Sequence, residues 1–162
     1  MSSIYLLLGG NQGERVTVLA KARQLLAEQL GTIIASSPLY ETAAWGKTDQ
    51  PDFLNQAIHI NTKFSPVESL SIIHHIEQLL GRQRTEHWGQ RTLDIDILFY
   101  DDAIIHSSRL VIPHPEVQNR RFALIPLKAI AAKLMHPVLG KDISTLLEEC
   151  PDKLEVFLFE DF

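Results

Sequence analysis

The sequence predicts an α+β domain in which helices pack on a mainly antiparallel sheet, and two patterns support this prediction. Apolar and polar residues alternate over 53–64 and 94–100, which is typical of strands. Apolar residues recur at helical spacing over 15–30 and 66–80. Because the alternation leaves one side of the long strands more polar, we expect a sheet covered on one face, not a doubly wound parallel sheet.

The first half of the chain is expected to hold one helix between strand segments. Residues 4–8 form an apolar strand, and the glycine-rich run 9–13 follows as a turn. Such a turn can bind phosphate, but no GK[ST] follows it and its spacing is not GxGxxG, so we favour a structural turn next to the site. The helix over 15–30 should stop at Gly31. Strands are expected at 32–40, interrupted by Pro38, and at 53–64.

The second half begins with a strong helix signal, because Ser65, Pro66 and Glu68 suit the N-cap, the first turn and a capping box. This helix should end near residue 80, before Gly81. A strand at 94–100, a turn and a return strand beginning at 104–105 follow. A helix over 122–132, a short helix capped by Ser144 and a strand at 156–159 complete the chain.

The predicted order of the main elements is β-α-β-β-α-β, followed by extra helices and short strands. This is the order of the ferredoxin-like architecture. The length of 162 residues suffices for one domain with a good core, and we expect the whole chain to form one domain.

Composition excludes several classes of function. A net charge of −5 and a pI near 5.8 argue against a general nucleic-acid binder. No apolar run is long enough to cross a membrane, and the N-terminus lacks the basic flank of a signal peptide. The single cysteine, Cys150, allows no internal disulfide and fits a reducing compartment, so we expect a cytoplasmic protein with this side chain wholly or partly buried.

The arginines are unevenly distributed. Six of the eight lie between residues 82 and 121, a span without lysine. Guanidinium groups offer a planar fork to phosphate, so this distribution predicts a local anion site in an acidic protein. The acidic residues near the C-terminus are interpreted as a solvated face; they are Glu148, Glu149, Asp152, Glu155, Glu160 and Asp161.

The pair Asp94 and Asp96 is the strongest chemical signal. On a strand, two residues that are two positions apart share a face and lie about 6–7 Å apart. Leu98 and Tyr100 are expected on that same face, which places the acids near one end of the strand. With arginines and Trp88 just before them, the acids suggest bound Mg²⁺ and polyphosphate. A solvated edge strand or surface ion pairs would also explain the pattern.

Other polar and aromatic residues allow two interpretations each. Trp45 lies in a predicted loop and is either a lid over a ligand or a plug at the core edge. His114, between two prolines, either has no role or donates a hydrogen bond to phosphate. Asn55 on its strand is by default a cross-strand or solvent contact. His74 and His75 are expected at the surface or at an edge.

Taken together, these residues resemble the 6-hydroxymethyl-7,8-dihydropterin pyrophosphokinases of folate biosynthesis. The resemblance covers essentially the whole chain, and its most specific part is the string WGQRTLDIDI at 88–97. It also includes Gly9-Gly10-Asn11, Tyr40-Glu41-Thr42, Gln50-Pro51-Asp52-Phe53-Leu54-Asn55, Glu77, Gly81-Arg82-Gln83-Arg84, Pro113-His114-Pro115 and Asn119-Arg120-Arg121-Phe122. The family often has Ser at Gly10, two prolines at Ala43-Ala44, Tyr at Phe53 and Pro at Gln90.

The resemblance implies transfer of pyrophosphate from MgATP to the hydroxymethyl group of the pterin, with release of AMP. It implies that Asp94 and Asp96 hold two Mg²⁺ ions, that Arg82 and Arg91 are catalytic clamps, and that residues 82–91 form a lid. The implied ATP contacts are Glu77, Arg84, Trp88, Arg109, His114 and Arg120. The implied pterin contacts are Thr42, Ala44, Trp45, Phe53, Asn55 and Phe122. We expect a monomer whose partners are these small molecules, without nucleic acid or membrane.

Two other classes of function remain possible from the residues alone. One is a ferredoxin-like module that binds a metal–nucleotide complex without chemistry, and the other is a DxD-type nucleotide-sugar transferase. Products separate them: AMP identifies a pyrophosphokinase, ADP an ordinary kinase, and UDP-sugar turnover a glycosyltransferase.

Overall fold

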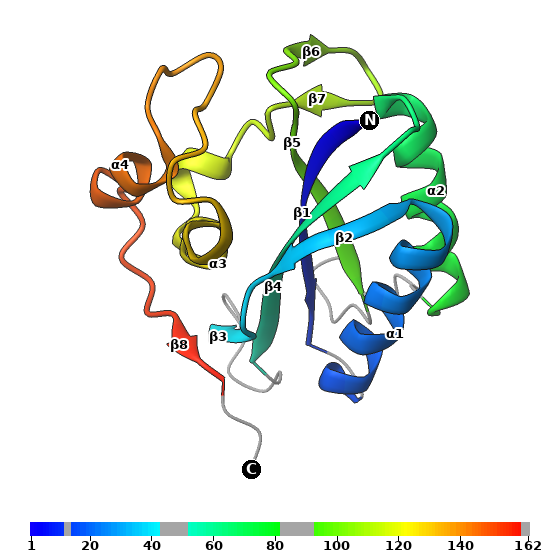
Figure 1. Cartoon of the computed structure of the whole chain (residues 1–162). Coiled ribbons are helices and arrows are strands. Elements are labelled where there is room, and N and C mark those ends of the chain that lie inside the picture. The colour runs from blue at the N-terminus through cyan, green and yellow to red at the C-terminus, as the bar shows by residue number, and fades with distance from the viewer. Residues whose placement is uncertain (12–13, 43–51, 82–92, 160–162) are drawn as a thin grey trace.

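The computed structural model of the chain describes residues 1–11, 14–42, 52–81 and 93–159. Within these residues, six strands form one sheet in the order β5-β1-β4-β3-β8, with β2 also pairing with β4, and every pairing is antiparallel (Figure 1). The strands are β1 (Ser2–Gly10), β2 (Gly31–Ser36), β3 (Tyr40–Thr42), β4 (Phe53–Thr62), β5 (Asp94–Tyr100) and β8 (Phe157–Leu158). The short strands β6 (Ile105–His106) and β7 (Val111–Ile112) form a separate pair.

Helices cover both faces of the sheet (Figure 1). The helices α1 (Arg15–Gln29) and α2 (Pro66–Leu79) pack on one face, where their buried residues join those of the central strands in one core. The elements η1 (Val117–Asn119), α3 (Arg121–Ala131) and α4 (Ile143–Glu148) form a second core on the other face. The expectation of a sheet covered on one face is therefore wrong: Leu7, Ala57 and Phe99 bury the second face against these later helices.

The prediction of a ferredoxin-like core is confirmed. The long antiparallel pairing of β1 with β4 runs from Ser2↔Thr62 to Gly10↔Leu54, and β1 lies between β5 and β4 inside the sheet. The helix start at Ser65 is also as predicted, because the Ser65 hydroxyl accepts from the Glu68 N–H while the Glu68 carboxylate accepts from the Ser65 N–H. Gly81 follows α2 with a φ of +78°, as expected of a helix stop.

One predicted helix boundary is confirmed and another differs from the structure. The helix α1 ends at Gln29 with Leu30 as its C-cap, so it stops before Gly31 as predicted. Gly31 is also the first residue of β2, where a Cβ atom would lie 2.0 Å from the Asn61 carbonyl oxygen. Glycine is needed there for close backbone approach. Ser144 lies inside α4, and Asp142 caps this helix by accepting from the Thr145 N–H at 2.8 Å.

Two predicted strand boundaries also differ. Gly9 and Gly10, expected in a turn, belong to β1. The strand β6 pairs with β7 and does not return along β5. The antiparallel pairing of β1 with β5 places Leu7 opposite Asp96 and Gly9 opposite Asp94.

An irregularity in β5 reverses its alternation. The pairing with β1 shifts between Tyr5 and Leu6, which face Phe99 and Ile97 respectively, so Leu98 is inserted as a bulge. Leu98 and Phe99 therefore both lie in the second core, whereas Tyr100 lies in the first. The expectation that Tyr100 shares the face of Asp94 and Asp96 is wrong for this reason.

The structure bears on two further expectations. Cys150 is buried, with 3% of its surface exposed. In the described parts of the chain, no helix combines the length and the apolar character that a membrane span requires.

Candidate functional site

Two neighbouring hollows lie beside β5. The larger opens on the face of the sheet that α3 partly covers, and the smaller lies between β5, α2 and the segment that carries His114. The larger has a volume of about 680 Å³ and the smaller a volume of about 540 Å³. Asp94, Asp96 and Arg120 line both of them. Whatever binds in one hollow therefore meets the contents of the other at these three side chains.

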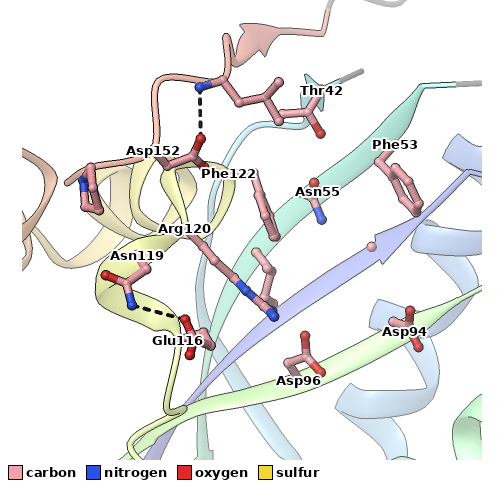
Figure 2. A pocket seen from close by; sticks show the side chains of 14 residues that line it. Thr42, Phe53, Asn55, Asp94, Asp96, Glu116, Asn119, Arg120, Phe122 and Asp152 are labelled. Carbon is pink, nitrogen blue, oxygen red and sulfur yellow. Dashed lines mark hydrogen bonds between the residues drawn. The ribbon is translucent and has the colours of Figure 1, made fainter. Parts of the chain in front are cut away.

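The sheet register places the acids beside the larger hollow. Gly9 of β1 pairs with Asp94 of β5 on one side and with Asn55 of β4 on the other. Since neighbouring strands lie about 4.8 Å apart, the backbones of Asp94 and Asn55 are about 10 Å apart. Figure 2 shows Asp94 and Asp96 projecting from β5 to the same side, as the strand period predicts.

Gly9 makes room for Asn55. A Cβ atom on Gly9 would lie 2.5 Å from Asn55 Nδ2, which is closer than any side chain tolerates. Asn55 is buried, with 6% of its surface exposed, yet its side chain lines the larger hollow. The glycine thus allows a buried amide to face a ligand from the floor of the site.

The remainder of the larger hollow combines apolar and aromatic side chains with the polar side chains of Glu116, Asn119 and Asp152. Thr42 and Phe53 face each other across the pairing of β3 with β4. Phe53 and Phe122 lie on either side of Asn55 in Figure 2. The Cζ atom of Arg120 lies 5.7 Å from the centre of the Phe122 ring, within the range of a cation–π contact. Two aromatic rings around a central amide suit a flat ligand with polar edges.

The smaller hollow contains His114 in a fixed position. Its backbone N–H donates to the Leu98 carbonyl at 3.0 Å, and its Nδ1 accepts from the Glu116 N–H at 3.1 Å. Burial is the largest influence on the pKa of His114 and lowers it; Arg120 lowers it further, while Asp96 and Glu116 raise it. A neutral imidazole that accepts at Nδ1 carries its proton on Nε2, so His114 can donate one hydrogen bond to an anion.

Glu77 supports β5 from the side of α2. Its side chain is buried, lines the smaller hollow, and accepts a hydrogen bond from the Ile95 N–H at 2.9 Å. Ile95 lies between the two acids, so this carboxylate contacts the backbone that carries them.

The pair Asp94 and Asp96 suits a magnesium site that is completed by other ligands, not a metal site built from protein side chains alone. Across the described residues, no group of three or more His, Cys, Asp or Glu side chains is arranged to hold a metal. Mg²⁺ characteristically binds through one or two carboxylates and completes its shell with waters and substrate phosphates. Asp94 and Asp96, on one strand face beside a hollow with arginines, match this pattern.

All ten of the predicted site residues that lie within the described parts line one or both hollows. Thr42, Phe53, Asn55 and Phe122 line the larger hollow, Glu77, Arg109 and His114 line the smaller, and Asp94, Asp96 and Arg120 line both. The roles assigned to them stay predictions. Ala44, Trp45, Arg82, Arg84, Trp88 and Arg91, with the expected lid, lie outside the described residues.

Sequence reasoning missed several residues of the site. Asp152 was assigned to a solvated acidic face, but it lines the larger hollow together with Pro151 and Leu154. His74 is exposed, in agreement with its expected place at the surface or an edge, but it also lines the smaller hollow. No local pattern marks these residues. Asn119, which also lines the larger hollow, was signalled by its place in the run before Phe122.

Comparisons with known proteins agree with the geometry. The family model described as 7,8-dihydro-6-hydroxymethylpterin-pyrophosphokinase (HPPK) matches residues 5–132. The chain is 43% identical over 136 residues to the 2-amino-4-hydroxy-6-hydroxymethyldihydropteridine pyrophosphokinase of Methylorubrum extorquens, covering 83% of this chain and 86% of that protein. The enzyme of the same name from Aquifex aeolicus is 38% identical over 149 residues, covering 92% of each chain.

Solved structures support the fold. The wild-type Plasmodium falciparum HPPK-DHPS structure superposes with a TM-score of 0.73 at 20% identity and covers 92% of this chain. This chain spans only 43% of that longer protein. At this level of identity, the likeness concerns the fold alone.

Proposed function

Because the chain belongs to the 7,8-dihydro-6-hydroxymethylpterin-pyrophosphokinase family, we propose that it transfers pyrophosphate from ATP to 6-hydroxymethyl-7,8-dihydropterin and releases AMP, as a step of folate biosynthesis. One observation carries the proposal at the level of the site. Two hollows of different character meet at the same two carboxylates and one guanidinium group. A transfer between two bound molecules requires such a meeting point.

The larger hollow suits the pterin. A pterin is flat and aromatic, with hydrogen-bond donors and acceptors along its edge. In our proposal it lies between Phe53 and Phe122, and the Asn55 amide reads its edge beside Thr42. Ala44 and Trp45 complete this set as expectations from the family resemblance.

The smaller hollow suits ATP. Arg109 and Arg120 offer guanidinium groups to the phosphates, and His114 donates one hydrogen bond from Nε2. Glu77 lines the same hollow, and Arg84 and Trp88 are further expected contacts. Mg²⁺ on Asp94 and Asp96, in our proposal two ions, supplies charge neutralisation to the triphosphate when it is bound.

The reaction requires mainly that the two substrates are held in the correct position relative to each other. The hydroxymethyl oxygen of the pterin forms a bond to the β-phosphorus, the bond from that phosphorus to the oxygen bridging to the α-phosphorus breaks, and AMP departs with that oxygen. The hydroxyl proton is released. Arg120 extends from the start of α3 toward Asp96, where it faces the charge that builds up on the transferred group (Figure 2). Arg82 and Arg91 are the further clamps expected from the resemblance.

We further propose a cytoplasmic monomer in which residues 1–162 form one pyrophosphokinase domain and only small molecules are bound. The net charge of −5 argues against binding of nucleic acid, and the single cysteine fits a reducing compartment such as the cytoplasm.

Product analysis tests the function. The purified chain is incubated with MgATP and 6-hydroxymethyl-7,8-dihydropterin, and the nucleotides are separated. We expect AMP in amounts equal to the pterin diphosphate, and no AMP when EDTA is present. ADP would indicate an ordinary kinase. A second incubation with UDP-sugars tests the glycosyltransferase alternative, and turnover in neither incubation would indicate a binding module.

A further inference from the structure

We propose that residues 151–159 form part of the dihydropterin site, and that Asp152 is a positioning residue for Phe122 and thereby for the pterin. The identity of the ligand in this inference rests on the proposed function. The family model ends at residue 132, so this segment lies outside the pattern that defines the family.

The segment forms one wall of the larger hollow. Pro151, Asp152 and Leu154 line it together with Phe53 and Asn55 of β4. Figure 2 shows Asp152 above Phe122, at the start of α3. A ligand between the two phenylalanines therefore lies against this segment as well as against the sheet.

Both carboxylate oxygens of Asp152 are engaged by backbone N–H groups. Oδ2 accepts from the Arg121 N–H at 3.1 Å, and Oδ1 accepts from the Leu154 N–H at 2.9 Å. Arg121 is the first residue of α3, and the N-cap residue Arg120 makes no side-chain cap bond of its own. Asp152 thus provides a cap from 31 residues away in the sequence. A carboxylate at this helix end is also favoured by the helix dipole.

This cap acts on the residues that contact the substrates. Arg120 precedes Arg121 and lines both hollows, and Phe122 follows it and lines the larger one. Fixing the Arg121 N–H fixes the first turn of α3, and with it the direction in which the Phe122 ring extends. Asp152 therefore holds one ring of the aromatic pair without touching the reacting atoms.

The C-terminal end of residues 151–159 is held against β3, which contributes to another wall of the larger hollow. The strand β8 pairs with β3 through Tyr40↔Leu158 and Glu41↔Phe157, and the Phe159 N–H donates to the Leu39 carbonyl at 2.9 Å. The strand β3 carries Thr42, which lines the larger hollow. Figure 1 shows this path from α4, past α3, to β3.

Arg15 reinforces the same fastening. Its guanidinium donates to Glu41 Oε2 at 2.7 Å and to the Asp52 carbonyl at 2.6 Å, and its Cζ atom lies 5.6 Å from the centre of the Phe159 ring. Residues 151–159 thus connect α3 with β3, the two elements that present Phe122 and Thr42. A connection between two walls sets the width of the hollow between them.

The test separates pterin binding from stability. Asp152→Ala removes both acceptors, Asp152→Asn keeps the shape and one acceptor oxygen, and Glu155→Ala removes an exposed acid of the same segment as the matched control. For each full-length variant, the KM values for dihydropterin and ATP and the midpoint of thermal unfolding are measured. The Kd of dihydropterin is measured by calorimetry with α,β-methylene-ATP present.

For Asp152→Ala, we expect the KM and Kd for dihydropterin to rise roughly tenfold (about 1.4 kcal/mol) while the KM for ATP changes far less. Asp152→Asn should lie between this variant and the parent, and Glu155→Ala should match the parent. Unchanged pterin binding in the alanine variant would overturn the inference, as would an equal rise for both substrates. If the alanine variant does not fold, the asparagine variant decides on the same criteria.

The two proposals fail separately. A parent protein that binds dihydropterin in an Asp152-dependent way but releases no AMP rejects the proposed reaction and supports the positioning role. A parent protein that does not bind dihydropterin rejects both.

Discussion

The Glu77 side chain accepts a hydrogen bond from the backbone N–H of Ile95 at 2.9 Å, at the residue that separates Asp94 from Asp96. The strand β5 is an edge strand of the described sheet, so one of its sides has no strand beside it. A buried carboxylate from α2 takes the place of a strand at this point. The relationship makes Glu77 a support of the acid pair.

Glu77→Ala should lower the affinity of the enzyme for Mg²⁺ as well as for ATP. Loss of an outer-shell partner of a metal ligand typically costs about 10–100-fold in metal affinity or activity. We expect the Mg²⁺ concentration for half-maximal activity to rise roughly tenfold in this variant. Glu77→Gln, which retains an acceptor oxygen, should recover part of the loss.

Titration of activity with Mg²⁺ at saturating ATP is the measurement. Glu68→Ala, an exposed acid at the other end of α2, is the matched control. A Glu77→Ala variant with an unchanged Mg²⁺ requirement and a raised KM for ATP would instead show a contact to the nucleotide.

Asp94→Asn and Asp96→Asn should each abolish most of the turnover. Both side chains line the two hollows, and removal of one group that stabilises transition-state charge costs about 10²–10³ in kcat. The steady-state rate of AMP release is measured at several Mg²⁺ concentrations. Asp102→Asn, in the exposed turn after β5, should behave as the parent. Retention of more than roughly a tenth of kcat in both variants would contradict metal ligation by this pair.

The sequence predicted the centre of the site because its signals are local. Asp94 and Asp96 share a strand face by simple alternation, and Asn55 is two residues from Phe53 on another strand. The capping box at Ser65 likewise depends on residues only three positions apart. Such patterns survive in a single sequence because neighbours along the chain determine them.

The rest of the site depends on long-range pairing. Asp152 reaches the hollow only because the chain after α4 returns past α3, and nothing near it in the sequence signals this. The bulge at Leu98 follows from the register between β1 and β5, which alternation alone does not determine. The second core was missed for the same reason, since α3 and α4 could have packed on either face.

Phe122→Ala should weaken dihydropterin binding much more than ATP binding. Loss of an aromatic wall removes apolar contact worth about 1.5–3 kcal/mol, or roughly ten- to a hundredfold in Kd. Calorimetry with each ligand measures the difference. Phe122→Leu should recover part of the affinity because it keeps apolar bulk. A small effect on ATP is expected, because Arg120 rests on this ring; a larger effect on ATP than on pterin would overturn the stacking assignment.

Glu68 gives a pH-dependent contribution to stability. Two interactions lower the pKa of Glu68 from the ordinary value of 4.5. The larger is its hydrogen bond to the Ser65 backbone, and the smaller is its hydrogen bond to the Ser65 hydroxyl. A carboxyl group whose pKa is lowered in the folded state contributes its full stabilisation of the fold at pH values above its ordinary pKa. This contribution is lost as the pH falls through the pKa of the folded state.

Thermal unfolding of the parent and of Glu68→Gln over a pH series checks this contribution. The parent should unfold at a higher temperature near neutral pH, and the two midpoints should converge below pH 4.5. A difference that persists undiminished at the acidic end would assign the effect to something other than the charge of Glu68.

Gly9→Ala should damage the pterin site without touching a predicted ligand contact. The new Cβ atom would lie 2.5 Å from Asn55 Nδ2, so the Asn55 amide must turn away from its position in the hollow. A misplaced hydrogen bond to the pterin edge costs about 1–3 kcal/mol, so we expect the Kd for dihydropterin to rise roughly tenfold or more. Gly140→Ala is the control. Gly140 has a φ of +66°, and a Cβ atom added there would have no atom of any residue beyond its two chain neighbours within 4 Å. That variant should lose about 1 kcal/mol of stability but keep its affinity for pterin. If Gly9→Ala bound dihydropterin as tightly as the parent, the amide of Asn55 would not be the group that reads the pterin edge.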